Sequence, residues 1–439
     1  MRPAFILLVV TLLCPVPMAQ SSRSKPARPS TDPRVVHAAA LVIDTHADTP
    51  QRFLDENFDI GSDAGEGEID LAKIARGNLG AEFFSIWVEP RHKGQYARRA
   101  FRLIDSVYRQ AQLHPDKIMM AFSPADIEAA HRQHKLAALM GIEGGHAIES
   151  DLGLLRDFAR LGVRYMTLTW SNTNEWADSS GDISDPDVPH HNGLTPFGRD
   201  VVLEMNRLGM MVDISHVADK TFWDAIQTTR APVIASHSSA RALTNAPRNM
   251  TDEMLKAVAK NGGVVMVNFY NGFIDDDYRK ANAAQSRARD AAVEQAVADW
   301  QKAHPGKEVP YYVSERVSRE WAKKIPRPPL KALIDHIDHI AKVAGVDHVG
   351  LGSDFDGVSG GLPQGIDSAA DLPKITEALM ARGYTAADVR KVLGENLMRV
   401  FREVERVAAQ LRGNQPEWHP AQTAGAAPKA KGKAAATPR

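Results

Sequence analysis

Cysteine is almost absent from this sequence of 439 residues, in which Cys14 is the only one. Cys14 lies in an apolar segment near the start of the chain, so we expect the mature protein to contain no thiol. A chain without a pair of cysteines cannot form an internal disulfide. The fold must therefore depend on a large hydrophobic core, which a chain of this length can bury.

Long hydrophobic runs are equally scarce, and only residues 5–14 form one. This run follows Arg2 and precedes small residues up to Ala19, which is the pattern of a secretory signal peptide. We predict a signal peptide over residues 1–19, a linker over residues 20–33 and a periplasmic or secreted protein. A membrane anchor is the alternative, but we expect no stable membrane insertion after removal of the signal. The bulky Leu13 before Cys14 argues against lipid attachment.

The sequence also lacks an excess of charge of either sign. It contains 53 Lys and Arg residues against 54 Asp and Glu residues, for a formal net charge of -1. Binding of nucleic acid requires a concentrated basic surface, so we exclude nucleic acid as a partner. The segment 413–439 is rich in Ala, Pro and Lys and cannot bury enough apolar surface to fold. We expect it to be a disordered tail.

Residues 34–412 alternate short apolar runs with amphipathic segments. Alternating strands and helices predict a parallel sheet, and eight such units predict a closed (β/α)8 TIM-type barrel. The predicted strands cover residues 41–48, 81–88, 136–143, 164–170, 210–216, 232–237, 263–269 and 348–354.

One interval breaks this alternation. Residues 270–329 follow the seventh predicted strand and are rich in Asp, Arg, Lys, Ala and Gln. Insertions on barrels tend to lie in the loops after strands, so we predict a helical insertion over the mouth of the barrel. A solvated spacer without contact to a substrate is the alternative, and the sequence does not decide between them.

Ionisable side chains follow five of the predicted strands, at the point where each strand ends. Because active sites of such barrels lie at the C-terminal ends of the strands, we expect these side chains to share one rim. Buried ionisable groups are costly unless they are paired or bind a metal. The residues concerned are His46, Asp48, Glu143, His216, His237 and Asp354.

The types of side chain at this rim favour zinc. Imidazole nitrogen and carboxylate oxygen both suit Zn²⁺, and three histidines with two carboxylates are too many for one tetrahedral ion with an open position. Two ions roughly 3.5–4 Å apart that share one carboxylate fit better. Glu143 is the natural bridge, since its strand lies between those that carry the other ligands. Such a site would generate hydroxide for attack on a carbonyl.

Several motifs together resemble the membrane (renal) dipeptidase family of zinc-dependent hydrolases, in a bacterial-type form. The similarity extends from about residue 42 to residue 405. The motifs are Asp44-Thr-His46-Ala-Asp48, Gly141-Ile-Glu143-Gly-Gly-His146, Asp213-Ile-Ser-His216-Val, Ser236-His237-Ser-Ser-Ala240, Arg248-Asn249 and Gly352-Ser-Asp354-Phe-Asp356-Gly.

The resemblance implies that the barrel is of the metal-dependent hydrolase kind and that it binds two Zn²⁺ ions. His46, Asp48 and Glu143 would hold one zinc, and Glu143, His216 and His237 would hold the other. Arg248 would receive the C-terminal carboxylate of the substrate, for which a planar guanidinium is well suited. Glu143 and Asp354 would be the catalytic residues. His146 lies beyond two glycines and is expected outside the ligand set.

The implied activity is that of a zinc-dependent dipeptidase. A metal-bridging hydroxide would attack the peptide bond of a dipeptide, including D-residue or dehydro substrates. Asp354 would contact the free amino group and assist proton transfer. Members of the family often dimerise, so a homodimer is one expected assembly, although the sequence carries no interface motif.

One residue departs from the family pattern. Family members often carry a histidine where this chain has Trp170, and that histidine polarises the substrate carbonyl. An indole N–H can donate a hydrogen bond but cannot accept a proton. Either Trp170 reshapes the substrate-binding pocket while Asn172 or Asn174 supplies the donor, or the substrate is not a simple dipeptide. The alternatives are therefore an amidohydrolase acting on N-acyl amino acids or modified peptides, and a metal-bound barrel without catalysis.

Overall fold

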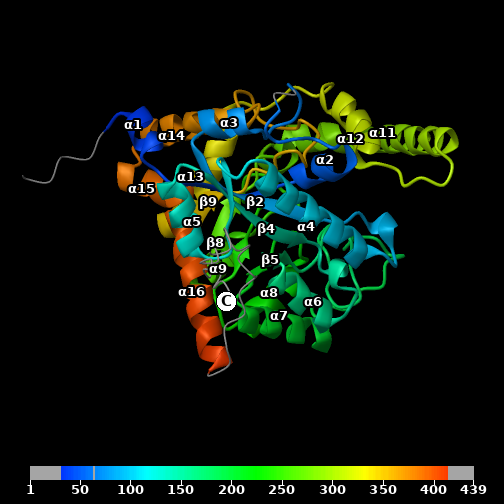
Figure 1. Cartoon of the computed structure of the whole chain (residues 1–439), viewed down its shortest axis with the longest axis horizontal. Helices are drawn as coiled ribbons and strands as arrows, with labels where there is room; N and C mark the ends of the chain where they lie inside the picture. Colours follow the sequence, from blue (N-terminus) through cyan, green and yellow to red (C-terminus); the bar gives the residue numbers. More distant parts are fainter. Residues whose placement is uncertain (1–30, 63–64, 414–439) are drawn as a thin grey trace, which may run out of the picture.

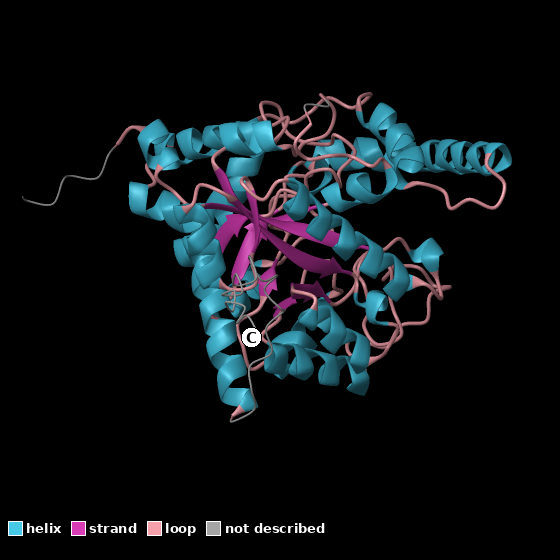
Figure 2. Ribbon diagram, viewed as in Figure 1, coloured by secondary structure: helices cyan, strands magenta, loops and turns pink. Residues whose placement is uncertain are grey.

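A computed structural model describes residues 31–62 and 65–413 of the chain. Its centre is a parallel barrel of eight strands with helices around it (Figures 1 and 2). The predicted barrel class is thereby confirmed. The strands, in spatial order, are β1 (Val42–Ala47), β2 (Leu79–Trp87), β4 (Leu136–Glu143), β5 (Val163–Thr167), β6 (Met211–Asp213), β7 (Ile234–Ala235), β8 (Val264–Val267) and β9 (Val349–Leu351).

The barrel closes where the chain after β9 meets β1. Ala47 and Phe355 form a parallel bridge, and the Asp48 amide donates to the Phe355 carbonyl at 2.8 Å. Asp44 reinforces the seam, because its carboxylate accepts hydrogen bonds from the backbone amide and the hydroxyl of Ser353. The same contacts place the ends of the first and last strands side by side.

Helices cover the outside of the barrel. In Figure 1, α16 runs along the left side of the barrel, and the pair α11 and α12 projects at the upper right. The helices outside the insertion are α1 (Pro33–Ala38), α2 (Thr49–Asp55), α3 (Leu71–Arg76), α4 (Tyr96–Leu113), α5 (Pro124–Arg132), α6 (Leu152–Arg160), α7 (Pro196–Leu208), α8 (Asp219–Thr228), α9 (Asp252–Asn261), α13 (Leu330–Ala344), α14 (Leu372–Ala381), α15 (Ala386–Arg390) and α16 (Asn396–Arg412).

The ends of these helices follow local sequence rules. Thr195 caps α7 through its side chain, and Gly209 ends it with a left-handed backbone at φ 78°. Thr385 and Asp388 form the reciprocal capping box that starts α15. Each device satisfies backbone groups that a helix end leaves without partners.

Several details of the sheet differ from the sequence prediction, and β6 and β9 each end three residues before their predicted ends. A short additional strand, β3 (Ile118–Met120), pairs with β4 outside the barrel order. The fourth barrel strand, β5, ends at Thr167, three residues before the predicted end at Trp170. After Thr167, the Leu168 amide still donates to the Asp213 carbonyl at 3.2 Å, while the Leu168 carbonyl accepts from the Asn174 side-chain amide at 2.9 Å.

The predicted insertion after the seventh barrel strand is helical. It contains α10 (Asn271–Ile274), α11 (Asp276–Ala303) and α12 (Tyr311–Ala322) before α13 begins. The contacts of α12 with α2 place it beside the C-terminal end of β1, which leads into α2. The insertion therefore lies at the rim where the candidate ligands were predicted.

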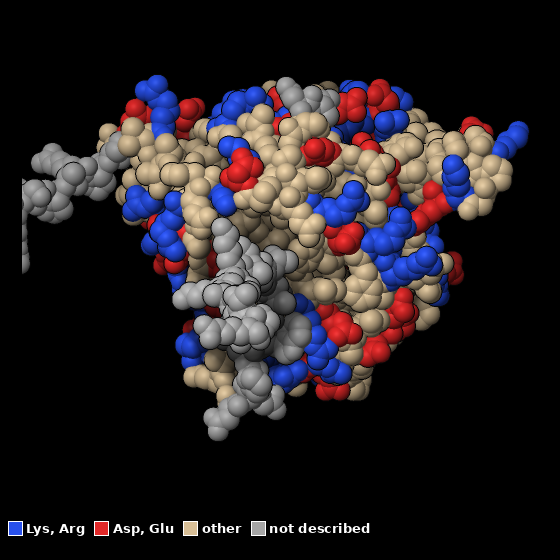
Figure 3. Space-filling view, viewed as in Figure 1, with Lys and Arg blue, Asp and Glu red and all other residues tan. Residues whose placement is uncertain are grey.

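The predicted terminal segments fall mostly outside the described residues. The signal peptide, the linker up to residue 30 and the tail from residue 414 lie there, and α1 begins at Pro33. Among the helices of the described part, none has both the length and the apolar character needed to cross a membrane. On the face shown in Figure 3, acidic and basic side chains are intermingled.

Candidate metal centre and active site

The five predicted metal ligands lie together at the C-terminal rim of the barrel, although the chain separates the first from the last by nearly two hundred residues. All five side chains are buried, and His46 and His237 are fully inaccessible. They come from the ends of β1, β4, β6 and β7 or from the residues that follow. The parallel order of these strands brings them together, as expected for this architecture.

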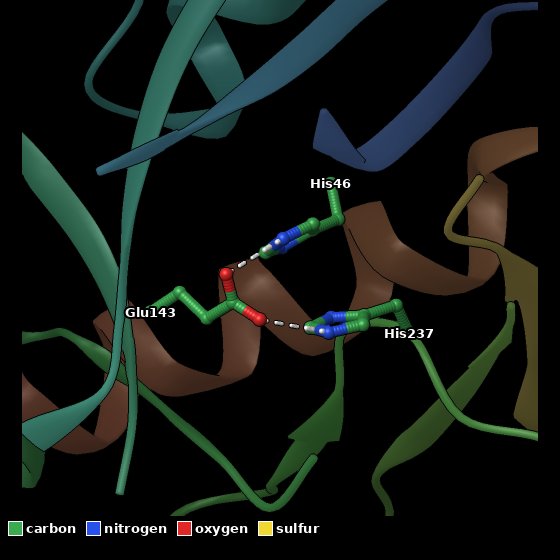
Figure 4. Close-up of side chains that lie close together, drawn as sticks. All are labelled: His46, Glu143 and His237. Carbon is green, nitrogen blue, oxygen red and sulfur yellow. Dashed lines mark ion pairs between the residues drawn. The ribbon is translucent and has the colours of Figure 1, made fainter. Parts of the chain in front are cut away.

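Glu143 lies at the centre of the cluster with one carboxylate oxygen facing each side (Figure 4). Its Oε2 lies 3.5 Å from His46 Nε2, which is also 3.7 Å from Asp48 Oδ2. Its Oε1 lies 2.8 Å from His216 Nε2 and 3.3 Å from His237 Nε2. The cluster thus divides into two groups of donors that share one carboxylate.

A buried tyrosine determines which nitrogen of His46 carries a proton. The Tyr165 hydroxyl donates to the Thr45 carbonyl at 3.0 Å, so its oxygen can only accept from His46 Nδ1, at 2.8 Å. His46 Nδ1 therefore carries the proton, and a neutral ring leaves the lone pair of Nε2 facing Glu143. Gly141 makes room for Tyr165, because a Cβ at Gly141 would overlap the phenol ring.

A second buried network has the same effect on His237. The Ser236 hydroxyl donates to Asp213 Oδ2 at 2.6 Å and accepts from His237 Nδ1 at 2.7 Å. Asp213 is held in turn by the Thr167 hydroxyl and by two backbone amides. The lone pair of His237 Nε2 is therefore also directed at Glu143. Such partners behind a ligand fix its orientation and raise its affinity for a metal.

The cluster in this form lacks the hydrogen bonds that buried polar atoms normally make. His46 Nε2 and Asp48 Oδ1 have no hydrogen-bond partner. His237 Nε2 lies 3.3 Å from Glu143 Oε1, and His216 Nε2 lies 3.0 Å from His237 Nε2 and 2.8 Å from the same Glu143 oxygen. Contacts this close between three atoms with lone pairs require a shared proton or a cation between them. The donor set therefore fits divalent cations with nitrogen and oxygen ligands.

The electrostatics of the cluster agree with this arrangement. Burial lowers the pKa of both His216 and His237 well below the usual value, so both rings are neutral at physiological pH. Burial also lowers the pKa of His46, but Tyr165, Glu143 and Asp48 outweigh it and raise that pKa well above the usual value. The carboxylates around His46 thus favour a positive charge at Nε2, either a second proton on the ring or a cation that takes the place of that proton.

A cavity of about 330 Å³ opens above the cluster. Asp48, Glu143, His216 and Asp354 line it on the side of the barrel. The insertion over residues 270–329 contributes to the lining, which favours a helical insertion over the mouth of the barrel; contact with a substrate stays a prediction. The residues of the insertion that line the cavity are Tyr270, Phe273, Tyr278, Asn282, Arg289, Tyr311, Ser314, Glu315, Ser318 and Ala322.

Asp354 adjoins the first group of donors. Ligand atoms of His46, Asp48 and Asp354 all lie within 4.8 Å of one another. Its Oδ2 accepts from the Asn268 side-chain amide at 2.8 Å, and its backbone is left-handed at φ 65°. Gly357 packs against the carboxylates of Asp48 and Asp354 so closely that a Cβ there would overlap both. Asp354 is thus held rigidly beside the cluster.

Arg248 lies close to the second group of donors but does not line the cavity. Its Nη1 donates to the Ser238 hydroxyl at 2.7 Å and its Nη2 to the His237 carbonyl at 2.8 Å. Its Nε is buried without a partner. Phe273, which does line the cavity, has its ring centre 5.4 Å from the guanidinium carbon. Burial lowers the Arg248 pKa to about 10, so the side chain stays cationic.

Trp170 lines the cavity, whereas neither of the two predicted substitute donors does. Asn174 is used within its own loop, since its amide donates to the Leu168 carbonyl and accepts from the Trp176 and Ala177 amides. Donation to a substrate by Asn172 or Asn174 therefore stays a prediction. His146 lies outside the cluster, with its Nε2 donating to the Val88 carbonyl at 2.7 Å.

Comparison with known proteins identifies the family. The model of the membrane dipeptidase family, peptidase family M19, matches residues 32–415. The chain belongs to this family. It is accordingly a hydrolase of the metallo-dipeptidase type, and the resemblance predicted from its motifs is confirmed.

Relatives support the assignment in sequence and in fold. Dipeptidase tcpJ from Claviceps purpurea (strain 20.1) is 34% identical over 359 residues, which cover 80% of this chain and 72% of the relative. The crystal structure of the probable dipeptidase PvdM from Pseudomonas aeruginosa has a TM-score of 0.73 at 26% identity and covers 86% of this chain and 98% of that chain. A metallo peptidase from Rhodobacter sphaeroides, liganded with a phosphinate mimic of the dipeptide L-Ala-D-Ala, has a TM-score of 0.66 at 26% identity. That match covers 83% of this chain and 99% of the other.

Proposed function

We propose that this protein is a dinuclear zinc dipeptidase. The observation that carries the proposal is the position of Glu143, whose two oxygens each face a separate group of buried donors. His46 and Asp48 would complete one zinc site, and His216 and His237 the other. The family relationship and the phosphinate dipeptide mimic in the Rhodobacter sphaeroides relative support a dipeptide as substrate.

Two zinc ions bound there would supply a water of lowered pKa as nucleophile and would polarise the peptide carbonyl. The residues of the chain supply orientation and proton transfer. Tyr165 and Ser236 hold the ligand histidines in the tautomer that presents Nε2. The Oδ2 of Asp354 accepts from Asn268, so Oδ1 is the atom that would pass a proton to the leaving amine.

Each end of a dipeptide would lie beside a side chain of the opposite charge. Asp354 would contact the free amino group, as the resemblance implies. Arg248 would receive the C-terminal carboxylate, for which its unpartnered Nε and its remaining N–H groups are free. Since Phe273 lies beside the guanidinium, we expect its ring to shift when a carboxylate binds. Fixed charges at both ends would restrict the substrate to two residues.

Trp170 favours a second candidate, an amidohydrolase acting on N-acyl amino acids or modified peptides. Its indole cannot carry the positive charge that a histidine could bring to the carbonyl. A panel of L,L-, L,D-, dehydro- and N-acylated substrates separates the two functions. Hydrolysis of dipeptides supports the first, whereas turnover of acylated substrates with dipeptides left intact supports the second.

Arg248→Ala tests the manner in which the substrate binds. If Arg248 receives the carboxylate, this substitution raises KM for dipeptides by at least tenfold, because a charge-assisted hydrogen bond is lost. For C-terminally amidated dipeptides, KM should rise much less. An equal rise in KM for both kinds of substrate would show that Arg248 only supports Ser238 and the His237 carbonyl.

Two further parts of the proposal concern the whole protein. One part is export through the predicted signal peptide over residues 1–19. Fractionation of cells that express the full chain checks it, and a protein retained in the cytoplasm would contradict it.

The other part is a homodimer. Light scattering of the purified protein checks it, and a monomer at working concentration would contradict it.

A further inference from the structure

Three aromatic rings from distant parts of the chain meet at one side of the cavity. Trp87 ends β2, Trp170 follows β5, and Tyr311 is the first residue of α12 in the insertion. The ring centres of Trp87 and Trp170 are 4.9 Å apart, and those of Trp87 and Tyr311 are 5.7 Å apart. All three residues line the cavity above the metal ligands. They form one continuous aromatic wall.

The wall adjoins the metal ligands directly. Trp87 pairs in register with Glu143 across the β2–β4 ladder. The ring of Trp170 lies 6.3 Å from that of His216. A side chain of a substrate whose peptide bond lies over Glu143 would therefore lie within reach of these rings.

Tyr311 is held in position by contacts that leave its ring free. Its backbone amide donates to Asp55 Oδ2 at 2.7 Å, and its hydroxyl donates to Glu315 Oε2 at 3.3 Å. Glu315 is itself fixed by the Ser359 hydroxyl at 2.6 Å and by Arg319 at 3.1 Å. Because the polar atoms of Tyr311 already have partners, its ring is the part that can contact a ligand.

We infer that Trp87, Trp170 and Tyr311 form a subsite for an apolar, preferentially aromatic, side chain of the substrate. This inference rests on the proposed dipeptidase function and specifies its substrate class. Aromatic rings bind one another in edge or offset arrangements and gain from apolar burial as well. The inference also gives the indole of Trp170 a role, because a charged imidazole in its place would interrupt the apolar wall. The insertion completes the subsite through Tyr311.

The test compares selectivity in the full-length, zinc-loaded enzyme. We expect kcat/KM to be higher for Phe-Ala or Ala-Phe than for Ala-Ala. The selectivity ratio is kcat/KM for the phenylalanine dipeptide divided by kcat/KM for Ala-Ala. Tyr311→Ala should lower this ratio about tenfold, because one aromatic contact and its buried area are lost. Tyr311→Phe should keep the ratio within about twofold, because it retains the ring. Tyr312→Ala is the matched control, since Tyr312 is the next residue of α12 and does not line the cavity.

Three results would overturn the subsite. The first is a wild type that does not prefer phenylalanine dipeptides to Ala-Ala. The second is a Tyr311→Ala variant whose kcat/KM falls equally for both substrates. The third is a Tyr311→Phe variant whose selectivity ratio falls as far as that of Tyr311→Ala. The last would mean that the hydroxyl acts instead of the ring.

Calorimetry with phosphinate analogues of Phe-Ala, Ala-Phe and Ala-Ala separates this inference from the proposed function, because binding requires no turnover. The subsite would be supported if the wild type bound a phenylalanine analogue more tightly than the Ala-Ala analogue and Tyr311→Ala abolished this difference. This support would hold even if no dipeptide were hydrolysed. Hydrolysis of dipeptides with an unchanged ratio would reject the subsite alone. Failure to bind any analogue would also reject it.

Discussion

Two histidines of the proposed metal centre have their proton positions set by residues outside the candidate ligand set. Tyr165 accepts from His46 Nδ1 and Ser236 accepts from His237 Nδ1, so both rings direct Nε2 at Glu143. A wrong tautomer would present an N–H where a lone pair is required. Metal affinity should therefore depend on Tyr165 and Ser236 almost as much as on the ligands.

Tyr165→Phe tests this dependence. The substitution removes the oxygen that accepts from His46, while the ring continues to fill the space beside Gly141. Loss of such a supporting hydrogen bond typically weakens metal binding 10–100-fold, and we expect a decrease of about that size. Competition with a chromogenic chelator measures it.

Tyr108→Phe is the matched control, because the Tyr108 hydroxyl donates to the Leu161 carbonyl, remote from the cluster. Equal metal affinity in the wild type and in Tyr165→Phe would contradict the role of Tyr165.

Single residues differed in how well the sequence predicted them. His46 and Glu143 could be predicted because ionisable side chains at the ends of apolar strands are unusual. Tyr165 could not, since an aromatic residue within an apolar strand is typical of a core. Asp213 belonged to a motif, but its function depends on a hydrogen bond to Ser236 that no spacing reveals.

Among the elements, the insertion is held against the barrel by buried ion pairs. Arg319 of α12 pairs with Glu68 at 2.9 Å and with Glu315 at 3.1 Å. Glu68 also accepts from the backbone amide of Asp356, after β9, at 2.9 Å. This network attaches α12 to the barrel through one shared cation, and removal of Arg319 would leave the Glu68 and Glu315 carboxylates buried without a cation.

Glu315 should make the stability of the protein depend on pH. Burial raises its pKa from 4.5 to about 7, against the opposing effect of Arg319. A raised pKa means that the folded state holds a proton that the unfolded state releases above pH 4.5. The stabilising contribution is therefore complete below that pH and is lost as the pH rises through 7.

We expect the free energy of unfolding of Glu315→Gln, relative to that of the wild type, to increase as the pH rises from 5 to 7.5. The gain is at most about 3 kcal/mol, from the size of the shift. Urea unfolding at fixed zinc concentration measures the difference. Glu320→Gln, which removes an exposed acid from the same helix, is the control. A difference between wild type and Glu315→Gln that does not change with pH would contradict the account.

The elements themselves were largely predictable. The alternation of apolar runs with amphipathic segments predicted the eight barrel strands, because this signal is local. The additional strand β3 has only three residues, too few for periodicity to indicate a strand. The contact of α12 with the cavity depends on pairs such as Arg319 and Glu68, which are remote in sequence.

At the scale of the whole molecule, the metal centre joins strands from across the barrel. Its five candidate ligands belong to four strand ends, and Asp354 follows a fifth, β9. No disulfide supports this arrangement, since the chain has one cysteine. Bound metal should therefore contribute to global stability, because ligands that bind only the folded state shift the folding equilibrium.

Removal of metal by a chelator should lower the melting temperature of the protein. The expected decrease is several degrees, since tightly bound metal should contribute several kcal/mol and 1 kcal/mol corresponds to roughly 1–2 °C for a domain of this size. Differential scanning calorimetry before and after chelation measures it, and restoration of zinc should reverse the change. A melting temperature unaffected by chelation would show that the cluster holds no metal that matters to the fold.

The most direct test of the account is a titration of metal-free protein with zinc while dipeptide hydrolysis is followed. The account predicts that activity rises to a plateau at two equivalents of zinc per chain. It also predicts that Glu143→Gln, which alters the shared carboxylate, does not reach that plateau. A plateau at one equivalent, or full zinc occupancy without hydrolysis of any dipeptide, would contradict the central claim.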